Sequence, residues 1–285
     1  MSEEGKFKFN LTQAALAAIS VILIAIGIYS ISMNQALTGP GGHDSDVGER
    51  VGAYEKYYYY DQDRKLRYES YGVRKPNMNP SEVVWRVNVD LDIPFYTKTI
   101  TVSDFTPPVL INKYRKLPDD FEPKELVNTS SGQMMTSETK AAYEALRDAA
   151  SEQGYHINAV SAYRSIEYQK GYYNKMVMEF GKDKTDRMIP RAAFSEQHLG
   201  TAVELSANGT ASESFDTTPE AAWIAENAHL FGFIVRYTED NQDVTGYDPL
   251  PGLVTYVGVE ISEAIHRLGI KSLEEYYVKH IEYQP

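Results

Sequence analysis

Residues 195–206 read SEQHLGTAVELS and contain side-chain types that a hydrolytic metal site would use. Imidazole and carboxylate groups, here His198 and Glu204, are nitrogen and oxygen ligands that zinc takes in proteins. A catalytic zinc needs three protein ligands and a water, but Gln197 offers only a neutral amide. The stretch is therefore either a metal site or what is left of one.

The composition of the chain excludes several other kinds of site. The 285 residues include no cysteine, which excludes disulfides, thiolate metal ligands and a cysteine nucleophile. The net charge is −12 and no long basic run occurs, so we expect no nucleic-acid partner. With 42% hydrophobic and 24% charged residues, the chain is typical of one globular domain with an appendage.

An apolar segment near the amino terminus predicts a membrane anchor. Residues 14–33 read AALAAISVILIAIGIYSISM, and about 20 apolar residues in a helix cross a hydrocarbon core of roughly 30 Å. Lysines precede the segment and carboxylates follow it, so the positive-inside rule places the amino terminus in the cytoplasm. We therefore expect a cytoplasmic end at 1–12, a transmembrane anchor at 13–33 and a single-pass protein of the cell membrane with its carboxy-terminal domain outside the cytoplasm.

A linker and a tyrosine-rich extension are expected after the anchor. Residues 34–52 are rich in Gly, Asp and Ser, and residues 53–106 contain the run YYYY. Tyrosine faces stack on sugars, but we favour packing against the main domain, because Tyr is often an amphipathic packing residue. Ser81 is expected to be the N-cap of a helix in this extension.

Residues 107–285 have the pattern of an α+β domain, a small sheet with helices packed on it. Alternating apolar residues predict strands, and apolar residues at helical spacing with capping residues predict helices. The expected strands lie at 157–163, 201–207, 233–237 and 253–260, and the expected helices at 136–155, 166–182, 218–232, 262–269 and 272–280.

Several stretches resemble, in order and spacing, the VanY-type D-alanyl-D-alanine carboxypeptidases. They are SAYRSIEYQ (161–169), RAAFSEQHLGTAVELS (191–206), WIAENAHLFGFIVRY (223–237) and TGYDPLPGLVTYVG (245–258), with INKYRKLPDDFEPKELV (111–127) as a lead-in. The resemblance covers about 107–280 and implies the fold of the LAS zinc peptidases, a small central antiparallel sheet with flanking helices. Such enzymes remove the terminal D-Ala from peptidoglycan stem peptides, with zinc activating a water and a carboxylate taking its proton.

The resemblance implies that the metal-binding positions of this chain have changed. The family takes its ligands from S-x-H-x-x-G-x-A-x-D and from the last residue of E-P-W-H, whose glutamate is the base. Ser195, Gly200 and Ala202 match the first motif, but its histidine position is Gln197 and its aspartate position is Glu204.

The second motif has lost both of its functional residues. Its base position is Leu250 and its last ligand position is Leu253, and leucine neither binds zinc nor accepts a proton. We therefore expect no intact catalytic residue and no bound zinc. One alternative is a rebuilt site in which His198, one place away, joins Glu204. Adjacent side chains on a turn point in different directions, so we favour His198 as a polar residue of a surface turn.

The substrate-binding side of the resemblance is less changed. Arg164, Gln169 and Ser195 stand where the family places groups that position the peptide, and a guanidinium suits a terminal carboxylate. Alternatively, Arg164 pairs with Glu204 in a site without a metal.

The sequence thus predicts a membrane-anchored, extracytoplasmic pseudoenzyme that binds a peptidoglycan stem peptide or a cell-wall enzyme. Two alternatives stay open. One is an active carboxypeptidase or peptidoglycan hydrolase with a rearranged metal site. The other is a purely structural interaction protein that uses residues 54–71 as its contact surface.

Overall fold

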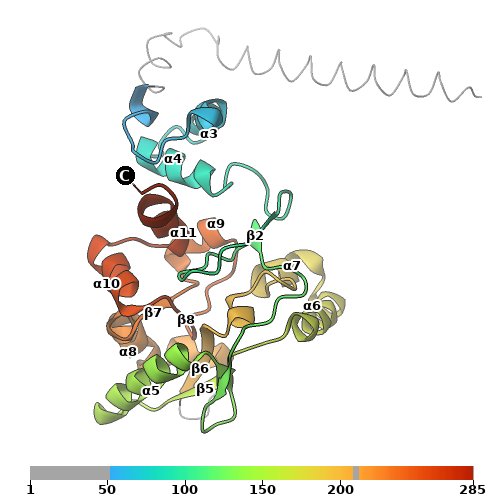
Figure 1. The fold of residues 1–285 in the computed structure, drawn as a ribbon, viewed down its shortest axis with the longest axis vertical. Helices are drawn as coiled ribbons and strands as arrows, with labels where there is room; N and C mark the ends of the chain where they lie inside the picture. The colour runs from blue at the N-terminus through green and yellow to red at the C-terminus, as the bar shows by residue number, and fades with distance from the viewer. Residues whose placement is uncertain (1–51, 208–211, 285) are drawn as a thin grey trace, which may run out of the picture. The chain divides into compact units, whose positions relative to one another are not determined.

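The computed structural model describes residues 52–207 and 212–284, which surround a four-stranded antiparallel sheet (Figure 1). Its strands are β5 (Ile157–Ser161), β6 (Ala202–Ala207), β7 (Phe233–Val235) and β8 (Leu253–Tyr256). Their spatial order is β5-β6-β8-β7. Burial alternates along β5, whereas β6 and β8 are buried over most of their length because both lie inside the sheet. The predicted α+β class with a small antiparallel sheet is confirmed.

One face of the sheet packs on α5 (Ser137–Glu152) and α8 (Pro219–Asn227) and forms the main hydrophobic core. Val203 and Leu205 of β6 are fully buried in this core. Since successive side chains on a strand point to opposite faces, Glu204 lies on the other face. The sheet therefore holds the candidate site on the side away from α5 and α8.

Capping residues begin and end these helices as their chemistry requires. Thr136 accepts a hydrogen bond from the N–H of Thr139 at the start of α5, and Thr218 accepts one from Ala221 at the start of α8. The helix expected at 218–232 is divided, because α8 passes into the 3₁₀ segment η4 (Ala228–Phe231) before the predicted stop at Gly232.

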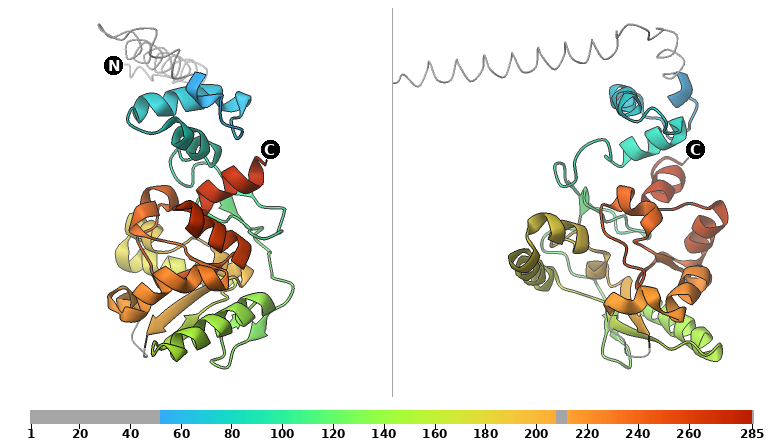
Figure 2. Two further views of the ribbon diagram at one scale, coloured as in Figure 1. Left: turned by 90° about the vertical axis from the view of Figure 1, so that its left-hand side faces the viewer. Right: turned by 180° about the vertical axis from the view of Figure 1, so that it is seen from behind.

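The tyrosine-rich extension lies next to the carboxy-terminal helices (Figure 2), and the two share a hydrophobic core. The extension contains η1 (Gln62–Arg64), α3 (Lys65–Arg74) and α4 (Pro80–Asn88), and the carboxy-terminal part contains α10 (Val259–Leu268), α11 (Leu273–Tyr277) and η6 (Val278–Glu282). Tyr54, Tyr59 and Tyr68 are buried in this cluster with Ile265 and Leu273. The expectation that these tyrosines pack against the main domain is confirmed.

Two sequence expectations about element boundaries were wrong. The N-cap of α4 is Asn79, whose side chain accepts a hydrogen bond from the N–H of Ser81, because Pro80 takes the first helical position. The strand expected at 253–260 ends at Tyr256, because Gly258 adopts a φ of +89° and α10 begins directly after it.

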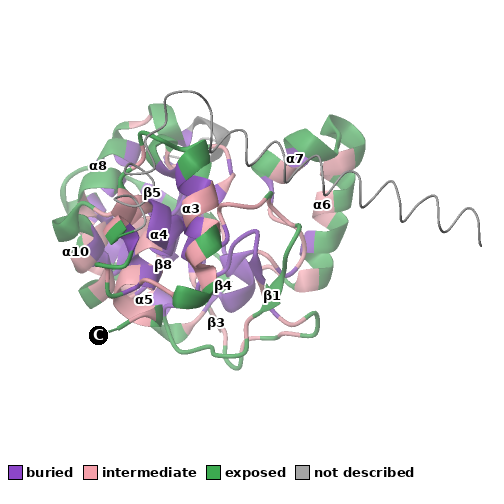
Figure 3. Ribbon diagram, turned by 90° about the horizontal axis from the view of Figure 1, so that it is seen from above, coloured by how far each residue is buried: buried purple, intermediate pink, exposed green. Residues whose placement is uncertain are grey.

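The remaining elements are short or exposed. The helices α6 (Ile166–Phe180) and α7 (Lys182–Met188) are mostly exposed, and α6 buries only Gln169 among its residues (Figure 3). The other elements are β1 (Ile100–Thr101), β2 (Arg115–Lys116), β3 (Val127–Asn128), β4 (Met134–Met135), η2 (Glu196–Leu199), η3 (Ser212–Thr217), η5 (Glu239–Asn241) and α9 (Gln242–Thr245).

Within the described part of the chain, no helix combines the length and the apolar character that a membrane crossing requires. The anchor expected at 13–33 lies outside the described residues, as do the cytoplasmic end at 1–12 and almost all of the linker at 34–52. Those three expectations stay predictions.

Candidate functional site

The SEQHLG stretch forms the 3₁₀ turn η2, and its two ends are held by hydrogen bonds. At its start, Ser195 Oγ accepts a hydrogen bond from the N–H of Gln197 over 3.2 Å. At its end, Gly200 adopts a φ of +74°, and its carbonyl accepts a hydrogen bond from Thr136 N over 3.0 Å. The positive φ of Gly200 favours glycine, and a side chain here would also crowd Leu126 and the backbone of Thr136.

The sheet brings the former ligand positions together. Glu204 on β6 lies in register between Ser161 on β5 and Leu253 on β8. Gln197 reaches the same place from the η2 turn, where its Nε2 donates to Ser161 Oγ over 3.2 Å. Three positions implied by the resemblance therefore share one site, although their side chains are an amide, a carboxylate and an alkyl group.

Arg164 forms an ion pair with the Glu204 carboxylate of this site. Its Nη2 donates to Glu204 Oε2 over 2.9 Å, and its Nε donates to Ser161 Oγ over 3.0 Å. The side chains of Arg164 and Glu204 are each 17% exposed, so the pair is accessible from solvent. The alternative in which Arg164 pairs with Glu204 is confirmed.

Leu253, by contrast, belongs to an apolar cluster. It is buried against Ala202, Tyr237 and Tyr247, and Leu250 packs against the same group. The positions where the family has its last zinc ligand and its base thus fill space between aromatic rings. The two leucine side chains themselves have no atom that could bind zinc or accept a proton.

His198 is buried, so its expected place on a surface turn was wrong. Its Nε2 accepts a hydrogen bond from Ala193 N over 3.2 Å, which leaves the proton on Nδ1 for donation to Arg164 O over 2.6 Å. Burial lowers the pKa of His198, which keeps the imidazole neutral. Ala193 has a φ of +69°, a conformation uncommon outside glycine. Both ring nitrogens are thus committed to the backbone, and neither is available to a metal.

These residues do not fit a catalytic zinc. Only Glu204 could act as a ligand at the site, whereas zinc needs three protein ligands. Across the described ranges, 52–207 and 212–284, no group of three or more His, Cys, Asp or Glu residues is arranged to hold a metal ion.

The other two expected substrate-contacting residues are buried. Gln169 donates from Nε2 to Pro190 O over 2.7 Å, which ties α6 to the loop ahead of η2. Its Oε1 is buried without a hydrogen-bond partner among the described residues. Ser195 is occupied as the N-cap of η2. A contact of either side chain with a substrate stays a prediction.

The sequence reading missed a fully buried ionic cluster beside the site. Arg236 Nε donates to Glu196 Oε1 over 2.8 Å, and its Nη2 donates to Glu274 Oε1 over 2.7 Å. Tyr237 OH donates to Glu196 Oε2 over 3.1 Å, and burial raises the pKa of this phenol well above its usual value. The sequence signal was weak, because Arg236 directly follows the apolar residues of β7 and the two glutamates lie in unrelated segments.

The extension also contacts the site loops. Tyr96 OH lies 3.0 Å from Tyr247 OH, and the Arg191 guanidinium stacks 3.7 Å from the centroid of the Tyr96 ring. Lys113 Nζ lies 4.0 Å from the centroid of the Tyr247 ring, and burial lowers the pKa of this lysine to about 8. The apolar cluster around Leu253 is thus bordered by Tyr96 of the extension and by Lys113 of the main domain.

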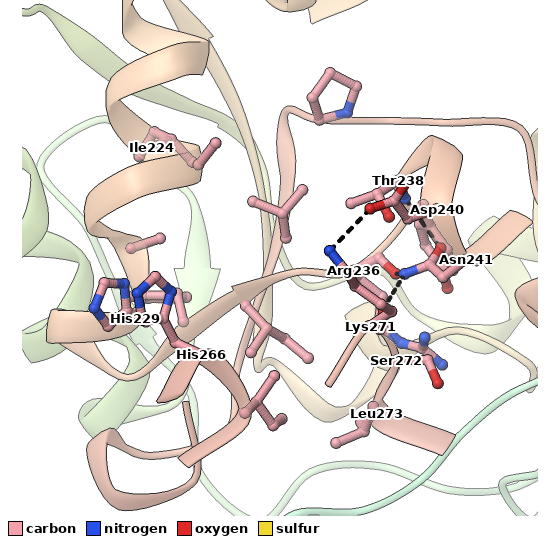
Figure 4. A pocket seen from close by; sticks show the side chains of 18 of the residues that line it. Ile224, His229, Arg236, Thr238, Asp240, Asn241, His266, Lys271, Ser272 and Leu273 are labelled. Carbon is pink, nitrogen blue, oxygen red and sulfur yellow. Dashed lines mark hydrogen bonds and ion pairs between the residues drawn. The ribbon is translucent and has the colours of Figure 1, made fainter. Parts of the chain in front are cut away.

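A cavity of about 470 Å³ lies beside β7, away from Arg164 and Glu204 (Figure 4). At one end His229 and His266 stack with ring centroids 3.6 Å apart, and at the other end Lys271 Nζ pairs with Asp240 Oδ2 over 3.0 Å. His229 therefore packs against a second imidazole at this end of the cavity.

Comparisons with known proteins agree on one family. The model of the VanY D-alanyl-D-alanine carboxypeptidase family matches residues 132–259. The chain is 31% identical over 182 residues to YodJ of Bacillus subtilis strain 168, and 29% identical over 177 residues to a D-alanyl-D-alanine carboxypeptidase of Enterococcus faecalis. These matches cover 60% and 59% of this chain and 66% and 64% of the relatives, slightly less than two thirds of each.

Solved structures give the same result. The LD-carboxypeptidase LdcB, in a structure described as revealing the molecular basis of peptidoglycan recognition, matches with 32% identity and a TM-score of 0.55. That match covers 60% of this chain and 85% of LdcB. VanYB in complex with D-alanine-D-alanine matches with 27% identity and a TM-score of 0.55, over 61% of this chain and 98% of VanYB.

Proposed function

Because this chain belongs to the VanY family of D-alanyl-D-alanine carboxypeptidases, we propose that it is a non-hydrolytic member that binds peptidoglycan stem peptides. The observation that carries the proposal is the pair Leu250 and Leu253, which occupy the base and ligand positions inside an apolar cluster. A site with one carboxylate and no free imidazole has no means of activating a water through zinc.

Arg164 supports a binding role for the same site. Its Nη1 has no hydrogen-bond partner in the part of the chain that the structure describes, whereas Nε and Nη2 are held by Ser161 and Glu204. The guanidinium is therefore fixed in place with one edge open. A terminal carboxylate placed there would receive a charge-assisted hydrogen bond. VanYB provides a precedent, since it has been solved with D-alanine-D-alanine bound.

The anchor at 13–33 and an extracytoplasmic position belong to the same proposal. They rest on the apolar run and on the lysines that precede it. A protein held at the outer face of the membrane would meet stem peptides close to where they are linked into the wall.

A calorimetric titration of the full chain in mild detergent tests this function, with a stem pentapeptide ending in D-Ala-D-Ala as the ligand. We expect saturable binding that Arg164→Ala weakens about tenfold or more, since a charge-assisted hydrogen bond contributes about 1.5–3 kcal/mol. Arg147→Ala is the matched control, because Arg147 pairs with Asp148 on the far helix α5.

The same preparation is then incubated with zinc and the pentapeptide, and free D-Ala is measured. We expect none above the level of a blank. Zinc-dependent release of D-Ala would contradict the non-hydrolytic assignment and restore the rearranged metal site. Absence of any binding would instead turn the search to protein partners.

A further inference from the structure

A second cavity, of about 730 Å³, is lined by neither Arg164 nor Glu204. Its walls come from residues 105–125, from the amino-terminal end of α5 and from the end of β8. Much of the lining is apolar, and the rings of Phe105 and Phe121 pack 5.0 Å apart along it. The cavity therefore offers hydrophobic surface to a ligand.

Carboxylates dominate the charge around this cavity. Asp120, Glu122, Glu125 and Glu138 line it, against the single cation Lys124. The neighbouring lysines are already engaged, because Lys116 pairs with Asp119 and Lys140 pairs with Glu144. Among residues 52–207 and 212–284, none of the four lining carboxylates has an ion-pair partner. Charge complementarity therefore favours a cationic ligand.

The amino-terminal end of α5 does not reverse this preference. A helix amino terminus carries partial positive charge, which would favour an anion. Here Thr136 Oγ1 already accepts a hydrogen bond from Thr139 N, and Glu138 places its carboxylate in the same first turn. The partial positive charge at the amino terminus of α5 is thus largely compensated by groups of the protein itself.

A buried hydroxyl in the lining is an independent sign of a ligand. Thr255 on β8 is only 2% exposed, and its Oγ1 has no hydrogen-bond partner among the described residues. Leaving a buried polar group unpaired costs about 1–3 kcal/mol. A ligand that donates a hydrogen bond to this oxygen would remove that cost.

We propose that this cavity binds an extended cationic peptide segment. Its lysine or arginine side chains would meet Glu122, Glu125 and the neighbouring carboxylates, while its aliphatic side chains pack on Phe105 and Phe121. One backbone N–H of the segment would donate to Thr255 Oγ1 once the neighbouring side chains that cover this oxygen move aside. This site is separate from the stem-peptide site, since it needs no terminal carboxylate and no contact with Arg164.

Calorimetry on the full chain tests the site with the probe Leu-Lys-Leu-Lys-Leu, acetylated and amidated so that it has no terminal carboxylate. We expect binding that weakens as salt is added, and no comparable binding of Leu-Gln-Leu-Gln-Leu. Glu122→Gln combined with Glu125→Gln should weaken binding about 3- to 30-fold, the loss of two partly exposed ion pairs. The matched control, Glu152→Gln with Glu179→Gln, makes the same charge change on exposed helix positions and should bind as the wild type does.

Thr255→Val tests the hydroxyl without opening a hole. We expect the affinity for the lysine probe to fall severalfold while the thermal unfolding midpoint does not fall, because the hydroxyl has no partner within the protein. Equal binding of the lysine and glutamine probes would overturn the proposal. So would an affinity that Glu122→Gln with Glu125→Gln lowers no further than the control does, or one that Thr255→Val leaves unchanged.

Discussion

Two arginine–carboxylate clusters lie next to each other on the η2 turn and differ in exposure. Glu196 joins Arg236 and Glu274, and these side chains are 1% exposed. One residue later, Gln197 faces the Arg164–Glu204 pair, whose side chains are 17% exposed. The same two chemical groups are thus sealed in the core on one side of the turn and reach solvent on the other.

The difference separates a structural role from a binding role. A buried ion loses its hydration, so every partner must stay in place once the fold has formed. The Arg236 cluster therefore locks η2 to β7 and α11. The Arg164 pair keeps part of its hydration and can exchange water for a ligand at little cost. Only the second cluster has the freedom that recognition requires.

The largest change is expected from restoring the metal ligands around the solvent-accessible Arg164–Glu204 pair, here called the open cluster. The restored site should bind zinc. Gln197→His combined with Leu253→His should raise zinc bound after purification from none to about one equivalent, because Glu204 and two imidazoles complete a three-ligand set. Metal analysis after dialysis measures the change. His198→Ala in the wild type should change nothing in that analysis, and zinc bound by the unaltered chain would refute the picture of a site without metal.

Breaking the buried cluster of Arg236, Glu196 and Glu274, here called the sealed cluster, should have the largest effect on stability. Arg236→Met leaves the Glu196 and Glu274 carboxylates buried without their cation, which should lower the free energy of unfolding by about 3–5 kcal/mol. Urea unfolding followed by circular dichroism measures it. A loss below about 1 kcal/mol would mean that water enters this cluster and that the contrast with Arg164 is smaller than the burial indicates.

His198 should make stability depend on pH. Burial lowers its folded pKa below the unfolded value, so the unfolded chain binds the proton first as the pH falls. Stability is therefore full above about pH 6.5 and declines as the pH drops toward the folded pKa, by at most about 1.4 kcal/mol per pH unit. Unfolding at pH 7.5 and 5.5 should show a shallower decline in His198→Asn. Identical declines would remove His198 as the cause.

Breaking the open cluster should have the smallest effect. Arg164→Leu combined with Glu204→Leu removes both charges together, and the free energy of unfolding should change by no more than about 1 kcal/mol, as for other partly exposed pairs. Comparing this double variant with each single variant isolates the energy of the pair itself. A loss as large as that of Arg236→Met would show that the pair serves the fold and not a ligand.

Much of the fold could be predicted from local patterns. The four strands and five of the helices follow alternation, helical spacing and caps that act within a few residues, such as Thr218 before α8. The two wrong element boundaries arose where neighbouring residues compete to begin or end an element. Asn79 displaced Ser81 as a cap because Pro80 supplies the first helical residue, and Gly258 ended β8 before the apolar pattern stopped.

The residue types at the candidate site were determined by the sequence alone. Leucine at 250 and 253 and glutamine at 197 have no group that can replace a base or an imidazole ligand, whatever their surroundings. The resemblance to the VanY family could likewise be read from motif order. Those conclusions depend on side-chain chemistry, which needs no coordinates.

Only the tertiary structure decided what the remaining side chains do. Arg164 and Glu204 are 40 residues apart and meet because β5 pairs with β6, and a register shift between Ala159 and Ser161 places Ser161 beside Glu204. His198 became unavailable to a metal because two backbone groups converge on its ring. Glu196 gained a buried partner, Arg236, from the residue that follows β7, 40 residues away in the sequence. Partners of this kind are set by long-range packing, which no local pattern in the sequence records.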